Sequence, residues 1–384
     1  MEMEKTKTKT KVREKFLQIE QELNENYLER ENVVRGLLVG LLTQQHVLLL
    51  GPPGTAKSML AHDLCSRIGG EYFQWLLSRT STPEELFGPI SLKALENDSY
   101  KRVTRGKLPE AQLAFIDEIF KSNSAVLNTM LSVLNERVFF NDGTPVNVPL
   151  EMAVGASNEL PEDREELGAL WDRFLLRFMV GYVRDPRNFE KLLTITKNGD
   201  PKTGVTEKEL KVARREINAI SISRIIPRIQ ELRRKVTELN IPVSDRRWRQ
   251  ILDVVKAQTW LNGGTAAADQ DLEILTAALW IEPEQIAQVR QAIMELANPL
   301  DMEALDLLDQ AMEIWQGAVS AGEDNSTAVG TEANAKLKKI TKKLEGIKKQ
   351  AEDGQKPTDR IEEAILQTAG WNKEVIAKCL GIDL

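Results

Sequence analysis

An eight-residue segment with the sequence GPPGTAKS constrains the fold of this chain more than any other feature. It follows the short apolar run His46–Leu50 and opens a helical pattern over Ala56–Ile68. Small residues let main-chain N–H groups wrap phosphate oxygens, and the helix N-terminus that follows favours negative charge. The lysine can reach the β- and γ-phosphates and the hydroxyl can serve Mg²⁺. The candidate phosphate-binding residues are Gly51, Pro52, Pro53, Gly54, Thr55, Ala56, Lys57 and Ser58, with Met59 directly after them.

The alternation of strand and helix patterns around this loop predicts an α/β fold. Further short apolar runs occur at Tyr72–Leu77, Leu113–Ile116 and Met152–Ala156, and Phe178–Val183 is a candidate fifth strand. Helical patterns such as Ala125–Leu134 lie between them. We therefore expect a parallel five-stranded sheet covered by helices.

Beyond the sheet the chain changes character. Helical patterns replace strand-like runs from about residue 188, at Glu207–Ile217, Ile222–Val236, Asp245–Leu261, Asp269–Trp280 and Pro283–Leu296. We expect a disordered tail over 1–11, an αβα nucleotide-binding core over 12–190 and an all-α domain over 191–298. A helical C-terminal region over 299–384 would contain a linker near 320–335.

Composition excludes several classes of protein. The net charge of −7 does not suit a nucleic-acid binder as a whole. Cys65 and Cys379 are the only cysteines, and His46 and His62 the only histidines, which excludes a disulfide scaffold and most histidine-based metal sites. No apolar run is long enough to cross a membrane and the first residues are polar, so we expect a cytoplasmic protein.

Polar residues follow two of the expected strands. Asp117 and Glu118 end one strand, where the aspartate could hold Mg²⁺ together with Ser58 and the glutamate could act as general base on an attacking water. Asn158 follows another strand and could hydrogen-bond the γ-phosphate, although an asparagine there is also a common helix cap. Beside a phosphate loop, this set favours nucleotide hydrolysis.

Arginines supply candidates for stabilising the transition state. Arg173 and Arg177 are spaced so that a helix would put both on one face, and Arg246 lies at the start of a helix that Ser244 could cap. Each arginine could equally form an ordinary surface ion pair.

Taken in order, six segments resemble the MoxR group of AAA+ ATPases. They are GPPGTAKS, STPEELFGP (Ser81–Pro89), FIDEIFKSNSAVLNTMLSVLNER (Phe115–Arg137), ASNELP (Ala156–Pro161), LWDRFLLRF (Leu170–Phe178) and VSDRRW (Val243–Trp248). The ASNELP, STPEELFGP and VSDRRW segments look most like the RavA subgroup. The phosphate loop of that group also resembles this one in its alanine before the lysine.

The resemblance implies a role for each matching position. Residues 51–58 would be Walker A, Asp117 and Glu118 Walker B, and Asn158 sensor 1. Arg173 would be the arginine finger acting on a neighbouring subunit, with Arg177 in reserve, and Arg246 would be sensor 2 in an all-α lid. Tyr27 would contact adenine, or be a core tyrosine. Residues 91–108 and 138–148 would be insertions facing the pore of a ring.

The resemblance further implies ATP/ADP and Mg²⁺ as ligands, a hexameric homo-oligomer, and a partner with a von Willebrand factor A domain. The activity would be ATP hydrolysis that drives chaperone-like remodelling or maturation of partner proteins. Three alternatives remain open: a DNA-associated AAA+ loader or regulator, a metabolite kinase, and a nucleotide-gated scaffold. The end of the chain (Ile361–Leu384) resembles the opening of a helix-turn-helix, but stops where its recognition helix should begin.

Overall fold

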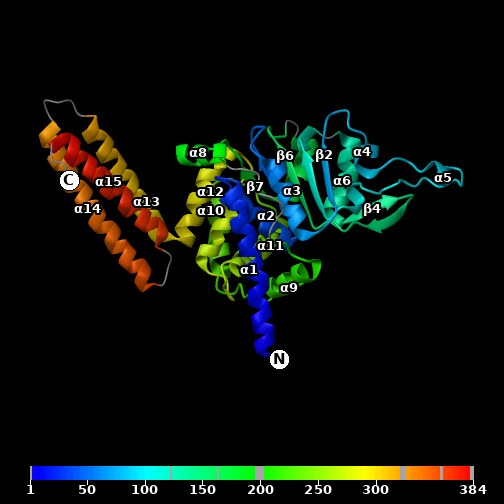
Figure 1. The fold of residues 1–384 in the computed structure, drawn as a ribbon, viewed down its shortest axis with the longest axis horizontal. Coiled ribbons are helices and arrows are strands. Elements are labelled where there is room, and N and C mark those ends of the chain that lie inside the picture. Colours follow the sequence, from blue (N-terminus) through cyan, green and yellow to red (C-terminus); the bar gives the residue numbers. More distant parts are fainter. Residues whose placement is uncertain are drawn as a thin grey trace. The chain divides into compact units, whose positions relative to one another are not determined.

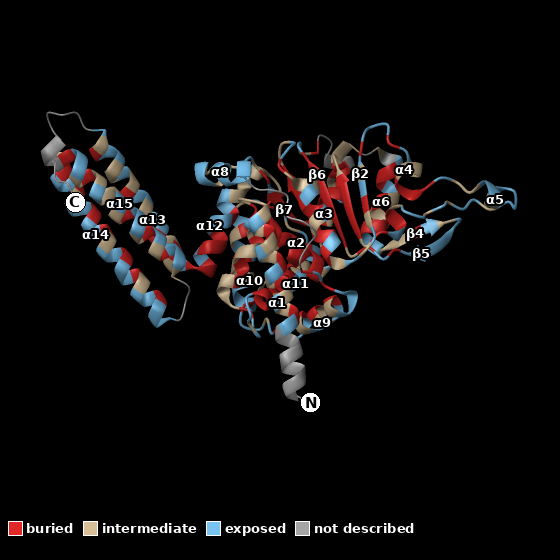
Figure 2. Cartoon of the chain, in the orientation of Figure 1, coloured by how far each residue is buried: buried red, intermediate tan, exposed pale blue. Residues whose placement is uncertain are grey.

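The computed structural model describes residues 2–121, 123–161, 164–194, 203–320, 326–354 and 358–380. They form two compact units, residues 1–289 and 290–384, each built around its own core (Figures 1 and 2). The sequence analysis placed the boundary between the all-α domain and the helical C-terminal region at 298/299. That boundary lies nine residues after the division between the two units.

The first unit is centred on a parallel five-stranded sheet in the order β2-β3-β6-β1-β7. The strands are β1 (His46–Leu50), β2 (Tyr72–Leu76), β3 (Leu113–Asp117), β6 (Met152–Ser157) and β7 (Phe174–Met179). Every residue of β1 and β6 is buried, as is typical of parallel strands covered by helices on both faces (Figure 2). The expected α/β sheet is confirmed.

The fifth strand lies four residues before the run expected to form it. β7 covers Phe174–Met179, with Leu176 opposite Val47 of β1, whereas the sequence indicated Phe178–Val183. The cause is that Phe174, Leu175 and Leu176 are all buried, and a strand buried on both faces has no apolar alternation to distinguish it from a helix. This shift also separates the two arginines described below.

Helices connect the strands. α3 (Lys57–Ile68) follows β1, α6 (Ser124–Glu136) follows β3, and α7 (Arg164–Arg173) joins β6 to β7. In parallel strand–helix units all the strands end at the same edge of the sheet, where ligands bind in such folds. The residues after β1, β3 and β6 are therefore brought to one edge.

Two helices precede the sheet, α1 (Glu2–Asn26) and α2 (Glu31–Thr43). The backbone over residues 2–11 is helical, which differs from the disordered tail expected there. The stretch holds no glycine or proline that would stop α1 from starting early. Phe16 of α1 packs edge-on against Trp260, with ring centroids 5.6 Å apart, so α1 joins the sheet unit to its all-α part.

The all-α part of the first unit comprises α8 (Pro186–Thr194), α9 (Glu207–Asn218), α10 (Ile226–Glu238), α11 (Asp245–Leu261) and the beginning of α12 (Ile286–Ala297). The helical pattern at Asp245–Leu261 is confirmed to the residue. Asp269–Ala277 forms a 3₁₀ helix where an α-helix was expected. There the buried Asp271 accepts hydrogen bonds from Thr259, Asn262 and the Ala268 amide, which hold a tighter turn.

Two excursions leave the sheet between β2 and β6. One carries α4 (Pro83–Phe87) and α5 (Leu92–Leu95), and the other is the antiparallel hairpin of β4 (Val138–Asn141) and β5 (Thr144–Asn147). Asp142 of the hairpin accepts hydrogen bonds from the Ser99 hydroxyl at 2.7 Å and the Tyr100 amide at 2.9 Å. The two segments expected to be insertions therefore project together (Figure 1).

The second unit contains a three-helix bundle of α13 (Pro299–Val319), α14 (Ser326–Asp353) and α15 (Asp359–Leu380). Trp315 and Trp371 stack in it, with ring centroids 5.6 Å apart. Most of the expected linker at 320–335 belongs to α14, because Ala333 is buried in the bundle and Val329 packs against its core. None of the described helices has the length and hydropathy needed to cross a membrane.

Candidate functional site

The phosphate loop connects β1 to α3 along a tightly determined path. Gly51 has φ 150°, and a Cβ built there would lie 2.0 Å from the carbonyl oxygen of Val180, which excludes any larger residue without a shift of backbone. Ala56 has φ 65°, in the left-handed region where glycine is usual. The alanine before Lys57 therefore adopts a backbone conformation that costs about 1 kcal/mol for a residue with a Cβ atom.

The amino end of α3 is open towards this loop. Ala56 is its N-cap residue and supplies no side-chain cap, so the amides of the first turn have neither an intrahelical partner nor a capping side chain. The Lys57 ammonium donates hydrogen bonds to the carbonyls of Gly51 (2.7 Å) and Pro52 (2.8 Å). Burial lowers the pKa of Lys57, while the nearby carboxylates of Asp117 and Glu118 act in the opposite direction. The loop thus offers free amides and a cation to an anionic group.

The two carboxylates stand at the end of β3, on the same edge of the sheet. The Asp117 carboxylate accepts a hydrogen bond from the Glu118 amide at 3.0 Å. Glu118 has φ 50°, so the chain turns sharply at this residue. Its Oε2 atom is buried and accepts no hydrogen bond from the described residues, although the Lys121 ammonium lies 3.4 Å away. A carboxylate oxygen held in this way can accept a proton from a water molecule.

The residues present fit a magnesium ion bound together with a nucleotide. The Ser58 hydroxyl at the start of α3 and the Asp117 carboxylate are oxygen donors of the kind that Mg²⁺ prefers. Within the described residues no group of three or more His, Cys, Asp or Glu side chains could hold a metal. Mg²⁺ bound with a nucleotide usually takes only one or two protein ligands, beside phosphate and water.

Asn158 and Met59 are both exposed, Asn158 directly after β6 and Met59 in the first turn of α3. Because β6 lies between β3 and β1, its carboxyl end falls between the Asp117–Glu118 pair and the phosphate loop. The sheet order therefore brings the segments after β1, β3 and β6 close together, although they are far apart in the sequence.

Tyr27 lies beside α3. Burial, together with a hydrogen bond to the Asp63 carboxylate, raises the pKa of its hydroxyl far above the usual value. Tyr27 is half-buried and its hydroxyl is bonded within the chain, and the adenine contact stays a prediction.

Other residues next to the loop were missed by the sequence analysis. The Arg30 guanidinium donates a hydrogen bond to the Gly181 carbonyl and is close enough to Lys57 to lower its pKa. The exposed Tyr182 lies one residue further on, with its hydroxyl 3.4 Å from the Pro53 carbonyl. No sequence motif marks either residue, because both reach the loop only through the position of the segment after β7.

The two candidate finger arginines are not on one helical face. Arg173 is the last residue of α7, whereas Arg177 lies within β7, so the expected helical spacing is wrong. Arg177 is buried, donates hydrogen bonds to the carbonyls of Trp280 and Phe174, and lies 4.4 Å from the Trp171 ring centroid. Its guanidinium is therefore not accessible to a neighbouring subunit, and the assignment of Arg173 as the finger stays a prediction.

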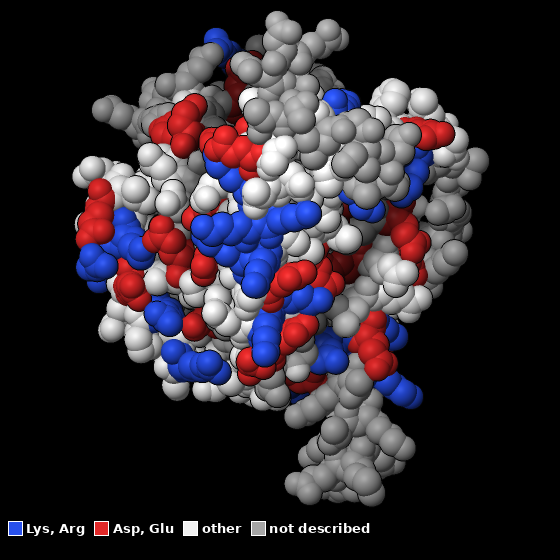
Figure 3. All heavy atoms as spheres, turned by 90° about the vertical axis from the view of Figure 1, so that its left-hand side faces the viewer, with Lys and Arg blue, Asp and Glu red and all other residues white. Residues whose placement is uncertain are grey.

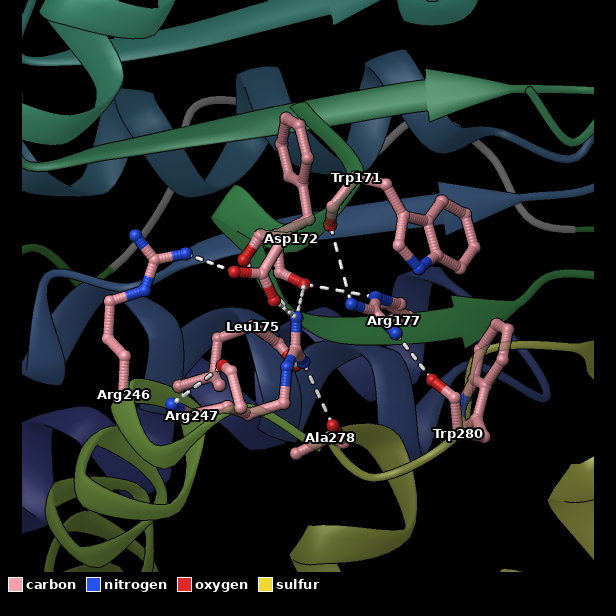
Figure 4. Close-up of polar contacts among 10 residues, drawn as sticks. Trp171, Asp172, Leu175, Arg177, Arg246, Arg247, Ala278 and Trp280 are labelled. Atoms are coloured by element: carbon pink, nitrogen blue, oxygen red, sulfur yellow. Dashed lines mark hydrogen bonds and ion pairs between the residues drawn. The ribbon is translucent and has the colours of Figure 1, made fainter. Parts of the chain in front are cut away.

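Arg246 and Arg247 both contact Asp172 of α7, but Arg246 is half-exposed and Arg247 is buried (Figure 4). The half-exposed Arg246 pairs with the Asp172 carboxylate, next to Arg173 in the sequence. Arg247 is buried and donates hydrogen bonds to the carbonyls of Leu175 and Ala278 (both 2.9 Å), and also to Asp172 and Phe174. Arg247 therefore fastens the all-α part to the sheet, a role that the sequence analysis did not assign.

Two family models match consecutive parts of this chain. Residues 14–221 match the family model described as the MoxR domain in the MoxR-vWA-beta-propeller ternary systems, and residues 224–293 match the model of an AAA lid domain.

Curated relatives include two uncharacterized proteins of Methanocaldococcus jannaschii, each 35% identical. The matches cover 95% and 93% of this chain and 97% of each relative. Chaperone MoxR1 of Mycobacterium tuberculosis is 27% identical over 40% of this chain and 41% of its own length. The crystal structure of a candidate ATPase from Cytophaga hutchinsonii has a TM-score of 0.62 at 18% identity and covers 78% of this chain and 99% of its own. At that identity the last likeness is one of fold.

Proposed function

Because the chain belongs to the MoxR family of AAA+ ATPases, we propose that it hydrolyses ATP to ADP and phosphate, with Mg²⁺, at the interfaces between subunits of a hexameric ring. The observation that carries the proposal is the buried Glu118 Oε2 atom at the sheet edge beside the phosphate loop, which among the described residues accepts no hydrogen bond and has the Lys121 ammonium 3.4 Å away. The ASNELP, STPEELFGP and VSDRRW segments support a place near the RavA subgroup.

In this proposal the chain's residues divide the chemistry. The free amides of α3 and the Lys57 ammonium bind the β- and γ-phosphates. Ser58 and Asp117 would hold Mg²⁺, which supplies charge neutralisation on the phosphate oxygens. Glu118 takes a proton from the water that attacks the γ-phosphorus, while the bond to the bridging oxygen breaks and ADP leaves. Asn158 orients that water or the γ-phosphate.

A neighbouring subunit would stabilise the negative charge that remains on the phosphate oxygens in the transition state. Arg173 would reach the nucleotide of the next subunit as an arginine finger. Arg246 would act at the same interface, because its contact with Asp172 places it beside the residue preceding Arg173. Both side chains are accessible in part, whereas Arg177 and Arg247 are buried.

The expected output of hydrolysis is remodelling or maturation of partner proteins in the cytoplasm. The family model names systems that also contain vWA proteins, and chaperone MoxR1 carries a chaperone description. We therefore propose a partner with a von Willebrand factor A domain. The DNA-associated alternative is not favoured by any of these matches.

The test is ATP turnover at increasing protein concentration, with Arg173→Ala and Glu118→Gln variants alone and mixed. Specific activity should rise with concentration, and each variant alone should lose at least about a hundredfold of turnover. Mixing should restore part of it, because an intact Arg173 can serve the intact Glu118 of a neighbour. Arg187→Ala, at an exposed arginine of α8, is the matched control and should keep full activity. Turnover that is independent of concentration and survives Arg173→Ala would overturn the interface mechanism.

A further inference from the structure

The C-terminal bundle carries exposed charged side chains that form no ion pair with the described residues and do not belong to the candidate nucleotide site. Its helices enclose a core of their own, including Leu337, Leu344 and Ile361, and they lie beyond residue 293, where the family matches end. Two of its helices present outer faces of opposite sign.

The first is a lysine face on α14. The buried side of this helix is formed by Leu337, Ile340, Leu344 and Ile347. The exposed lysines of the face are Lys338, Lys339, Lys342, Lys343 and Lys349. Within the described part of the chain none of these five forms an ion pair, in contrast to Lys336 and Lys348 of the same helix, which pair with Glu332 and Glu362. In the view of Figure 3, Lys and Arg side chains gather near the middle of the surface.

The second is an acidic face on α13. Its exposed acids are Glu303, Asp306, Asp309 and Glu313, and the helix from Pro299 to Val319 contains no lysine or arginine at all. Among the described residues none of the four has a cationic partner. At helical spacing they form one stripe, opposite the buried Ala304, Leu307 and Ala311.

The two faces match in length but cannot meet within one chain. The lysine face extends over twelve residues (338–349) and the acidic face over eleven (303–313), which is about 16–18 Å of helix in each case. Both helices turn their apolar sides to the bundle core, so their charged sides point away from it and from each other. A second copy of the chain offers each face the complementary one.

We propose that the bundle is a self-association element, in which the lysine face of α14 in one copy binds the acidic face of α13 in the next. Such a contact uses different surfaces on the two copies, so it is heterologous and can close a ring or extend a chain. An anionic polymer or membrane is the less suitable partner, because the acidic face of the same small bundle would repel it.

This inference goes beyond the proposed ATPase activity, since it needs no nucleotide and no residue of the nucleotide site. It can fail while the ATPase proposal stands, and the reverse also holds. Association should therefore be measured without nucleotide, on the full chain.

The experiment is sedimentation velocity at low salt with two charge-reversed variants. The lysine-reversed variant carries Lys338→Glu, Lys339→Glu, Lys342→Glu and Lys343→Glu. The acid-reversed variant carries Glu303→Lys, Asp306→Lys, Asp309→Lys and Glu313→Lys. The matched control for the lysine-reversed variant makes the same change of net charge at exposed positions of the first unit: Lys208→Glu, Lys211→Glu, Arg215→Glu and Arg224→Glu.

We expect each reversed variant to raise the dissociation constant for self-association at least about tenfold, and the control to leave it unchanged. An equimolar mixture of the two reversed variants should associate again, which a misfolded bundle could not do. Rising salt should weaken the wild-type contact, because exposed charges are screened.

Three results would overturn the proposal. The wild type could stay monomeric without nucleotide at every concentration, or both reversed variants could associate as it does. The lysine-reversed variant could instead lose binding to duplex DNA or to phosphatidylserine vesicles while its self-association is unchanged.

Discussion

Two adjacent arginines at the start of α11 should respond to the same substitution in opposite ways. Arg247 is 4% exposed, and its guanidinium serves the buried main-chain carbonyls of Leu175, Ala278 and Phe174. Arg246 is half-exposed and touches only the Asp172 carboxylate among the contacts described above. The prediction is that Arg247→Ala destabilises the protein, whereas Arg246→Ala impairs turnover without destabilising it.

The magnitudes follow from what each substitution leaves behind. A buried acceptor that loses its donor costs about 1–3 kcal/mol of stability. Arg247→Ala leaves three such carbonyl acceptors, and water entering the space left by the side chain would satisfy some of the three. We therefore expect Arg247→Ala to lower the free energy of unfolding by about 3–5 kcal/mol, because the three carbonyl acceptors lose their donor while Asp172 keeps Arg246 as its partner. An exposed pair contributes about 0–1 kcal/mol, so Arg246→Ala should change stability by no more than that.

Urea unfolding followed by tryptophan fluorescence is a suitable assay, because the Trp171 and Trp280 rings lie 6.0 Å apart beside the cluster. Arg247→Lys is a useful intermediate, since an ammonium cannot reproduce the planar fork of donors. ATP turnover of Arg246→Ala, measured on the same samples, should fall at least about tenfold. Equal loss of stability in the two alanine variants, or a change below about 0.5 kcal/mol for Arg247→Ala, would refute this division of roles.

Two further predictions concern the loop and the first strand. Ala56→Gly should raise the free energy of unfolding by about 0.5–1 kcal/mol, because glycine takes φ 65° without strain; a lower melting temperature would contradict this. His46 is buried, accepts a hydrogen bond from the Ala153 amide and donates one to the Leu134 carbonyl, and burial lowers its pKa to about 3. As the pH falls, His46 is protonated in the unfolded chain before it is protonated in the folded one. This difference should lower the free energy of unfolding by about 3 kcal/mol between pH 6.5 and pH 4. His46→Gln should remove that part of the pH dependence, and an unchanged pH profile of urea unfolding would argue against it.

Local patterns were sufficient for much of the fold. β1 and α11 begin and end where apolar periodicity and capping residues place them, because each is set by its own few residues. Periodicity failed at β7, where a strand buried on both faces carries the same apolar run as a helix. That error put Arg177 on a helix with Arg173, although its side chain is enclosed by Trp171 and Trp280.

By itself, the sequence was sufficient to predict the α/β fold and the family of this protein, and to select candidate residues for nucleotide chemistry. The loop from Gly51 to Ser58, the Asp117–Glu118 pair and the order of six motifs need only neighbouring residues to be recognised. The tertiary structure alone decided which arginines are free to act and which hold the fold together. Burial depends on segments distant in the chain, such as the carbonyls of Ala278 and Trp280, and no local pattern reports what will cover a side chain. The same holds for the charged faces of α13 and α14, whose outward direction follows from the packing of the bundle.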